Sequence, residues 1–515
     1  MKQLISCFIA LICATLLSNA QTYDFDLTAT AVKKYVNYPK GSILEIIGLE
    51  HRIERDQFYS SSTVLNDVYS MILQDGTAIP LTNKIDKALD FEIKSIDDLW
   101  NAAILQDVIP MLMKNGTQVD LRTETEQKTL EYIYAIKTHN MEFNDPYLLN
   151  YLYTLIAKIA PSTLIDGRPG SINLIIEDNP DINAGTYPNG TIVINTGLLA
   201  ALHTEDELVA VLAHEVAHFV LDHSMQNINA QIKRQERAAI GAAIATILTG
   251  IAEGAAAYYS NGYYMPGVAT AAVAIGATAI ACQAVIDLGM EYSQRQEFEA
   301  DAYAIQVLDF LGYDHNALAS ALTRLEDIML IERSKAMYFS SSSHPALVDR
   351  INEAGVADLK TDVDFERMMS FAITNSAFTK YDSRRFREAM NDVTRNIQNG
   401  VATADDYLIK ANCLLALSDT DTSNKEALAL VQKAKELQPD NVNIYKAEIL
   451  AELRLKNYQK AIAELNEYSG YLNEMDKVLP TILNESLWKQ SYNFTLNERL
   501  WIDKMLIKLN GMNVK

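Results

Sequence analysis

Two histidines and a glutamate form an H-E-x-x-H motif in a segment with the pattern of a helix. The motif comprises His214, Glu215 and His218, and residues 209–219 around it contain no Gly or Pro and carry apolar residues at helical spacing. At about 100° per residue, the two histidines lie only about 40° apart around the helix, one turn from each other. Both imidazoles therefore leave the same face and suit two corners of a tetrahedral zinc site, with Glu215 close enough to act on a metal-bound water.

A second acidic segment offers a third ligand. Glu297 and Asp301 are spaced i and i+4 in a stretch without helix breakers, 79 positions after His218, so their side chains share one helix face. Glu297 can complete a His₂Glu ligand set that leaves one position for water. Asp301 can accept the second N–H of a ligating imidazole, for which His214 is the candidate. His223 lies about 140° further round the first helix than His218 and is interpreted as a capping or surface residue.

These segments resemble a known family, the zinc metallopeptidases of HtpX and the CAAX prenyl endopeptidase, including their soluble periplasmic relatives. The resemblance covers roughly residues 145–352 and includes residues 183–199, the two helical motifs and a late Ser343-His344-Pro345 segment followed by Arg350-Ile351. One departure is Tyr187-Pro-Asn-Gly190, which replaces the usual Pro-Gly-Gly turn and leaves the shape of that turn open. The resemblance implies one Zn²⁺ per chain, Glu215 as the base, His344 on a loop near the metal, and three ligands: His214, His218 and Glu297.

The predicted reaction is hydrolysis of a peptide bond. Glu215 takes a proton from the metal-bound water and delivers it to the leaving amine, while the metal stabilises the carbonyl oxygen. For His344 three roles are open: a hydrogen-bond donor to that oxygen, a ligand that closes the metal site in a latent form, or a loop residue held by Pro345. The alternatives to an endopeptidase are an exported tetratricopeptide scaffold or chaperone that binds unfolded protein without cutting it, and another zinc hydrolase.

Two short β-branched segments, residues 172–176 and 192–194, precede the motif helix and predict a small sheet beside it. An extended substrate can add itself to the edge of such a sheet through main-chain hydrogen bonds, which places its scissile carbonyl at the metal. The alternative is a plain core strand. The candidate edge strand consists of Ile192, Val193, Ile194 and Asn195.

The composition is that of a globular, acidic protein with several domains. The chain has 515 residues, of which 21% are charged, and a net charge of −22, so we expect two to four domains. An acidic surface repels phosphates and anionic lipid. We therefore expect protein or peptide substrates and no nucleic-acid partner, and we interpret the acidity as a source of solubility.

The chain begins with a pattern typical of a signal peptide. Lys2 is followed by an apolar run from Leu4 to Leu17, and Ala20 ends a small-residue cleavage site. Without this segment only Cys282 and Cys413 remain. Two distant cysteines are no disulfide framework, and Cys282, in an apolar stretch, is interpreted as a buried free thiol. The mature protein is predicted to be exported to a bacterial periplasm, with association with the outer membrane as an option.

The pattern predicts an α+β, mostly helical protein in which a zincin core with a small β-sheet is followed by a tetratricopeptide-like helical domain. Segments that start near Ser61 and Ser95 have N-cap residues and helical spacing, so the region before the core is predicted to be helical. The predicted divisions are a signal peptide (1–20), a helical N-terminal region (21–140), a zinc metallopeptidase domain (141–358) and a tetratricopeptide-like domain (361–515).

An unusual apolar insert lies between the two metal-binding motifs. Residues 238–286 contain one charged residue, Glu253, and the 22 residues from Met265 to Ile286 are uncharged, which is long enough to span a membrane. These 22 residues are rich in Ala and Gly and contain no Leu or Phe, so their transfer energy is small. We therefore favour a helical hairpin, with the insert taken as 238–290, that packs on the protein or contacts a membrane surface.

Small residues repeat with the tetratricopeptide period near the C-terminus. Ala427 and Ala461 are 34 residues apart, and Ala389 belongs to an earlier copy that is offset by four extra residues. Such helix pairs can form a concave docking surface for a protein partner, or alternatively a structural cap over the peptidase.

Overall fold

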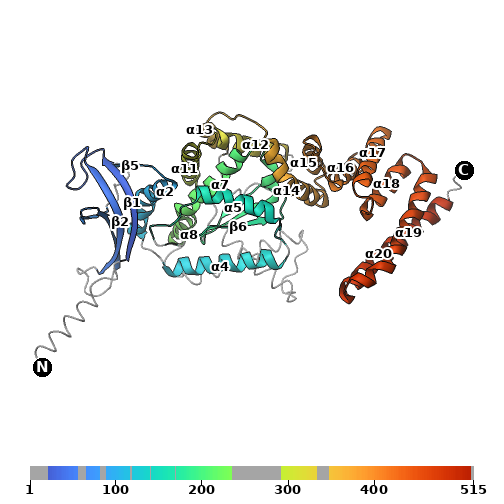
Figure 1. Cartoon of the computed structure of the whole chain (residues 1–515), viewed down its shortest axis with the longest axis horizontal. Coiled ribbons are helices and arrows are strands. Elements are labelled where there is room, and N and C mark those ends of the chain that lie inside the picture. The colour runs from blue at the N-terminus through green and yellow to red at the C-terminus, as the bar shows by residue number, and fades with distance from the viewer. Residues whose placement is uncertain are drawn as a thin grey trace, which may run out of the picture. The chain divides into compact units, whose positions relative to one another are not determined.

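The structure is a computed structural model that describes residues 21–55, 65–81, 88–115, 119–139, 141–166, 168, 170–234, 292–332 and 347–511. The chain divides into two compact units (Figure 1). The first contains Met1–Glu177, Asn183–Ile194 and Thr204–Lys360, and the second contains Asp178–Ile182, Asn195–His203 and Thr361–Lys515. The predicted signal peptide, the apolar insert at 238–290 and His344 lie outside the described residues. Among the helices that are described, none has the length and apolar character needed to cross a membrane.

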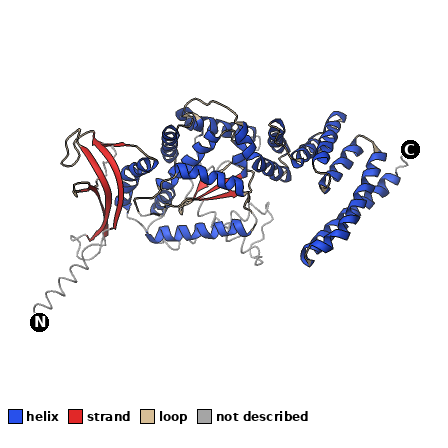
Figure 2. Cartoon of the chain, in the orientation of Figure 1, coloured by secondary structure: helices blue, strands red, loops and turns tan. Residues whose placement is uncertain are grey.

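The first unit begins with a β-sheet, so the prediction of a helical region from residue 21 onward is wrong up to residue 92 (Figure 2). The strands form one antiparallel sheet in the order β4-β3-β2-β1-β5. Their bounds are β1 (Gln21–Ala31), β2 (Ile43–Arg55), β3 (Leu65–Leu73), β4 (Ala78–Pro80) and β5 (Leu89–Glu92).

Burial with a period of two explains this sheet. In β1 the buried side chains are Leu27, Ala29 and Ala31, and the residues between them are more exposed. The segment after Ser61, which was predicted to be a helix, contains β3, where Tyr69 and Met71 are buried opposite β2. Pairing with a neighbouring strand thus overrides the local helical spacing, as is common for short apolar segments.

Helices follow the sheet and connect it to the core of the first unit. The helix predicted to open at Ser95 is confirmed, because Ser95 accepts a hydrogen bond from the main-chain N–H of Asp98 at its first turn. The buried indole of Trp100 donates to the carbonyl oxygen of Ile159 at 2.7 Å. These helical elements are α2 (Ile96–Ala103), the π-helical turn η2 (Ile104–Val108), α3 (Ile109–Asn115) and α4 (Val119–Thr138).

A three-stranded sheet lies between helices in the core of the first unit. Helix α4 packs on one face through Tyr132 and Ile136, which contact Ile175 and Val193, whereas α5 and α7 contact the sheet from the other side (Figure 1). The remaining elements are α5 (Pro146–Ile159), β6 (Asn173–Glu177), β7 (Ala184–Thr186), β8 (Thr191–Asn195), α7 (Glu205–Val220), α8 (His223–Arg234), α11 (Gln294–Leu311), α12 (Ala317–Glu332) and α13 (Leu347–Ala354).

The order of this sheet is β6-β8-β7, so the predicted edge strand, Ile192 to Asn195, is in fact its central strand. The sequence Ala184-Gly-Thr186 is too short and weakly patterned to predict a strand, yet it folds back beside β8 as β7. The turn between them needs glycine, since Gly190 has a φ of +79° and a Cβ there would lie 2.8 Å from the carbonyl oxygen of Ser171. Among the described strands, the edge beside the motif helix is therefore β7.

The second unit is a stack of helices, which confirms the predicted helical domain of tetratricopeptide type. Each helix contacts the next along the chain, and α14 and α16 also contact each other, as do α16 and α18. Ala389, Ala427 and Ala461 are completely buried and lie in α15, α17 and α19. The helices are α6 (Thr196–Ala201), α14 (Val363–Asp382), α15 (Phe386–Gln398), α16 (Ala404–Leu417), α17 (Asp421–Leu437), α18 (Val442–Arg454), α19 (Tyr458–Ile482) and α20 (Glu485–Gly511).

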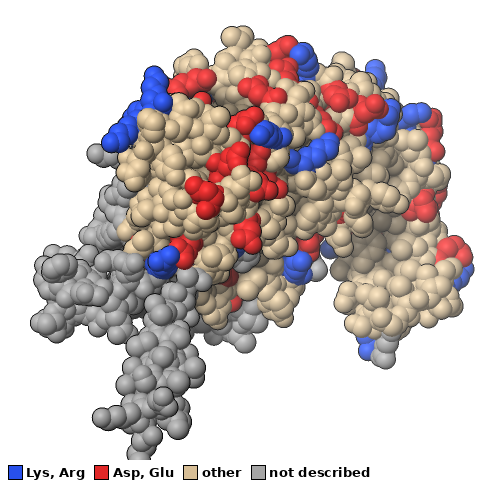
Figure 3. Space-filling model, turned by 60° about the vertical axis from the view of Figure 1, so that its left-hand side comes forward, with Lys and Arg blue, Asp and Glu red and all other residues tan. Residues whose placement is uncertain are grey.

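Charged side chains are spread over the surface. The chain has 66 acidic and 44 basic residues. On the face shown in Figure 3, the basic side chains of the described residues occur between acidic ones and do not form a continuous strip.

The buried alanines of the repeats allow a test of the helix packing in the second unit. Ala427→Leu inserts a larger side chain where α17 packs on its neighbours, and we expect a loss of about 1–3 kcal/mol of local stability. Ala429→Leu, at an exposed position of the same helix, is the matched control and should have little effect. Hydrogen exchange of α16–α18 peptides in the full chain measures both, and equal exchange in the two variants would contradict the packing.

Candidate metal centre

Helix α7 carries both histidines of the motif, and both of its ends are held by hydrogen bonds. The Thr204 hydroxyl accepts from the main-chain N–H of Glu207 at 3.1 Å, and acidic residues fill the first turn, where they complement the helix dipole. At the other end, the buried guanidinium of Arg168 donates to the carbonyl oxygens of Phe219 and Val220 at 2.6 Å each. These contacts fix the position of the helix that presents the imidazoles.

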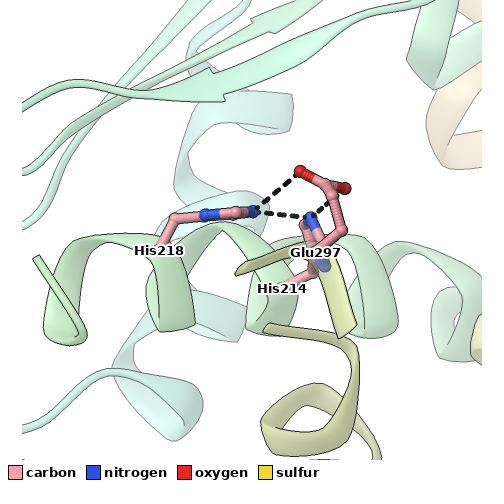
Figure 4. Close-up of side chains that lie close together, drawn as sticks. All are labelled: His214, His218 and Glu297. Atoms are coloured by element: carbon pink, nitrogen blue, oxygen red, sulfur yellow. Dashed lines mark hydrogen bonds and ion pairs between the residues drawn. The ribbon is translucent and has the colours of Figure 1, made fainter. Parts of the chain in front are cut away.

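The structure brings His214, His218 and Glu297 together, with Glu297 reaching across from α11 (Figure 4). The two Nε2 atoms are 2.9 Å apart, and the Glu297 carboxylate oxygens lie 3.7 Å from that of His214 and 3.6 Å from that of His218. All three side chains are buried. The two motifs therefore meet, and Glu297 lies where a third ligand was predicted.

The donor set fits a zinc ion. Asp301 Oδ1 lies 2.8 Å from His214 Nδ1, so this nitrogen carries the proton and Nε2 turns a lone pair toward His218 and Glu297. In a tetrahedral site with zinc–nitrogen bonds of about 2.0–2.1 Å, ligand atoms are roughly 3.3 Å apart, which is between the separations found here. Two imidazole nitrogens and one carboxylate are ligands that zinc prefers, so these residues would hold the ion implied by the motif.

Glu215 is buried beside this group and is held by the sheet. The hydroxyl of Thr186, in β7, lies 2.8 Å from Oε2 of Glu215 and 2.9 Å from its carbonyl oxygen. A hydrogen bond from this hydroxyl fixes one carboxylate oxygen and leaves the other to exchange a proton with a neighbouring group. The position suits a general base next to the metal ligands.

Arg350, in α13, is a site residue that sequence reasoning missed. Its guanidinium lies 2.5 Å from Glu297 Oε2 and donates two hydrogen bonds to the Asp301 carboxylate at 2.7 and 2.6 Å. Burial by itself raises the pKa of Asp301, but hydrogen bonds from His214 and Arg350 outweigh it and lower the pKa to about 2. One signal for this residue was present in the sequence, the Arg350-Ile351 pair of the family resemblance, but it does not indicate where the side chain points.

The interpretation of His223 as a capping or surface residue is wrong. Asp222 adopts a left-handed conformation with a φ of 60° between α7 and α8, and this turns His223 inward, where its Nδ1 lies 2.9 Å from Nδ1 of His218. Burial lowers the pKa of His223, although Glu299 opposes this shift. Tyr292, also missed, stacks on the His218 ring with centroids 3.7 Å apart.

Comparison with known proteins agrees with this geometry. Residues 150–356 match peptidase family M48, so this part of the chain is an M48 peptidase domain and the predicted family is confirmed. A putative beta-barrel assembly-enhancing protease of Vibrio cholerae is 29% identical over 43% of this chain and 42% of its own length, and the Escherichia coli K12 beta-barrel assembly-enhancing protease is 26% identical over 46% and 43%. A CAAX prenyl protease 1 homolog of Arabidopsis thaliana is 30% identical over 35% and 40%. The chain thus spans less than half the length of these relatives.

The ion pair of Asp301 predicts a pH dependence. Its pKa in the folded state, about 2, lies below the ordinary value of 3.8, so the stability it contributes is present above that ordinary value and is lost as the pH falls through about 2. We expect Asp301→Asn to lower the free energy of unfolding by about 2 kcal/mol at neutral pH, and this difference to shrink below about pH 4.

Urea unfolding detected by hydrogen exchange in α7 and α11 measures this difference across the pH series. A chelator is kept in excess, because metal affinity itself changes with pH. Asp309→Asn, at an exposed position of α11, is the control. A difference between wild type and Asp301→Asn that stays constant down to about pH 2 would contradict the ion pair.

Proposed function

We propose that this protein is a zinc-dependent endopeptidase of the bacterial cell envelope that hydrolyses peptide bonds in extended or misfolded protein segments. The observation that carries this proposal is the buried convergence of His214, His218 and Glu297 beside Glu215 within an M48 domain. Three ligands leave a fourth position open, which is typical of catalytic and not of structural zinc sites.

The residues around the metal have distinct parts in this chemistry. A bound Zn²⁺ supplies an activated water and a positive charge near the carbonyl oxygen of the substrate. Glu215, held through Thr186, accepts a proton and returns it to the leaving amine. Arg350 balances the charges of Glu297 and Asp301, so that the carboxylates keep their positions in a buried site.

The edge of β7 supports the proposal that the substrate is extended. Tyr187 N–H donates to the Thr191 carbonyl oxygen, and the alternation of an antiparallel pair then turns the main-chain groups of Ala184 and Thr186 away from β8. The hydroxyls of Ser224 and Tyr292 lie 3.5 and 3.4 Å from the outward carbonyl oxygen of Thr186. A peptide strand that pairs with Ala184 would lie next to the proposed metal site.

The proposed cellular setting rests on the relatives and on the predicted signal peptide. Two relatives are named beta-barrel assembly-enhancing proteases. We propose that this protein acts in protein quality control in the periplasm, in association with the outer membrane. The helical second unit would bind a protein partner. A role for His344 at the oxyanion or in latency, and contact of residues 238–286 with a membrane surface, stay predictions.

Glu215→Gln tests the proposed chemistry. The amide cannot accept the proton, so we expect cleavage of β-casein to fall by at least about 100-fold, whereas zinc content measured by atomic emission should stay at one ion per chain. Chelation should abolish the activity of the wild type, and added zinc should restore it. Activity at the wild-type level in Glu215→Gln would contradict the mechanism. A wild-type protein that contains no zinc and is inactive would favour a non-catalytic scaffold.

Proline at the sheet edge tests substrate binding. Ala184→Pro removes the outward N–H and should raise KM for β-casein about fivefold while changing kcat less, since one main-chain hydrogen bond to the substrate is worth about 1 kcal/mol. Ala184→Ser keeps the N–H at similar size and is the matched control. Equal KM values for the two variants would exclude pairing of the substrate with β7.

A further inference from the structure

The two imidazoles of the motif have different partners on the side that faces away from the metal site. Nδ1 of His214 lies 2.8 Å from a carboxylate oxygen of Asp301. Nδ1 of His218 instead lies 2.9 Å from Nδ1 of a second histidine, His223. Both histidines of this second pair are only 1% exposed, so the contact is with each other and not with bulk solvent.

The contact between two ring nitrogens requires one proton between them. Two unprotonated nitrogens 2.9 Å apart with no metal ion between them would turn their lone pairs against each other, and two protonated ones would clash. If the proton belongs to His223, then His218 in its neutral form carries its own proton on Nε2, which points at His214 and cannot bind a metal. If the proton belongs to His218, its Nε2 offers a lone pair to the site. Only the second arrangement makes His218 a ligand.

The far side of His223 completes this assignment. With Nδ1 acting as acceptor, neutral His223 carries its proton on Nε2, and this atom lies 3.5 Å from a carboxylate oxygen of Glu299. A carboxylate accepts hydrogen bonds and therefore favours that tautomer. Glu299 is itself fixed by Arg295, which donates to its other oxygen at 2.8 Å.

Helix α11 positions both ends of this arrangement. Glu297, inside the site, and Glu299, at the outer end, are two residues apart and therefore lie on different faces of the helix. A capping box between Ser293 and Gln296 fixes the first turn of the helix. The amide of Gln296 also lies 3.4 Å from the carbonyl oxygen of His223.

We propose that His223 is a positioning residue for the metal ligand His218: it accepts the Nδ1–H of His218 at its own Nδ1 and donates its Nε2–H toward Glu299. The proposal rests on the zinc site of the proposed function. Partners of this kind fix the tautomer and ring orientation of a ligand, and their loss costs about 10- to 100-fold in metal affinity. His218 thus depends on a neutral acceptor, whereas His214 depends on a charged one.

Zinc affinity, measured by competition with a chromophoric chelator, tests the proposal. His223→Leu removes the acceptor and should weaken zinc binding about 10- to 100-fold. His223→Asn places its Oδ1 on the same Cγ position as Nδ1 and should restore the affinity to within a few-fold of wild type. His315→Leu, at an exposed histidine that also contacts an aspartate, is the matched control and should bind zinc like wild type. Unchanged affinity in His223→Leu would overturn the proposal.

A spectroscopic readout separates tautomer positioning from a general packing effect. In the full chain loaded with Co²⁺, the wild type should show two exchangeable, hyperfine-shifted N–H signals, one for each ligand imidazole. In His223→Asn both should persist, and in His223→Leu the signal of His218 should exchange faster with solvent. Equal exchange of that signal in wild type and His223→Leu would refute the proposed hydrogen bond. Failure of the wild type to bind either metal would instead refute the proposed function.

Discussion

The centre depends on the ion pairs that Arg350 makes with two buried carboxylates. Glu297 is completely buried and Asp301 nearly so, and a buried carboxylate without a partner is costly enough to shift its pKa and become neutral. The guanidinium contacts both and so favours their anionic forms, which a metal ligand and its supporting acceptor need. Because Arg350 belongs to α13 and the acids to α11, the same contacts join these two helices.

Charge also explains why α7 and α11 can meet with polar side chains at their interface. His214 faces Glu297 on one side and Asp301 on the other, and His218 is enclosed by His223 and the ring of Tyr292. Each polar atom of these rings thus has a polar neighbour, which is the condition for burying them. Glu215, Glu297 and Asp301 together bring three negative charges, and Arg350 balances one of them. A divalent cation among the three ligands would offset the rest.

The sequence predicted those parts of the site that depend on spacing within one helix. The i and i+4 pairs on α7 and α11 follow from helix geometry, and so does the shared face of Glu297 and Asp301. Arg350 and His223 could not be placed, because their roles depend on where a helix end or a left-handed residue directs the chain. The N-terminal sheet was missed since its strands are specified by pairing partners, and β7 because Ala-Gly-Thr carries no strand pattern of its own.

The short strand β7 joins two tasks, to hold the proposed base and to offer a sheet edge, although the edge was predicted at residues 192–195. Thr186 holds the Glu215 carboxylate through its side chain, while its main chain belongs to the edge at which a substrate strand would pair. A strand added to that edge would restrict the backbone of Thr186 and thereby the hydroxyl that orients the base. Binding of an extended peptide and positioning of the proton acceptor would then be coupled through one residue. This coupling favours cleavage of segments that can become fully extended, because a folded segment cannot supply the main-chain hydrogen bonds on which it depends.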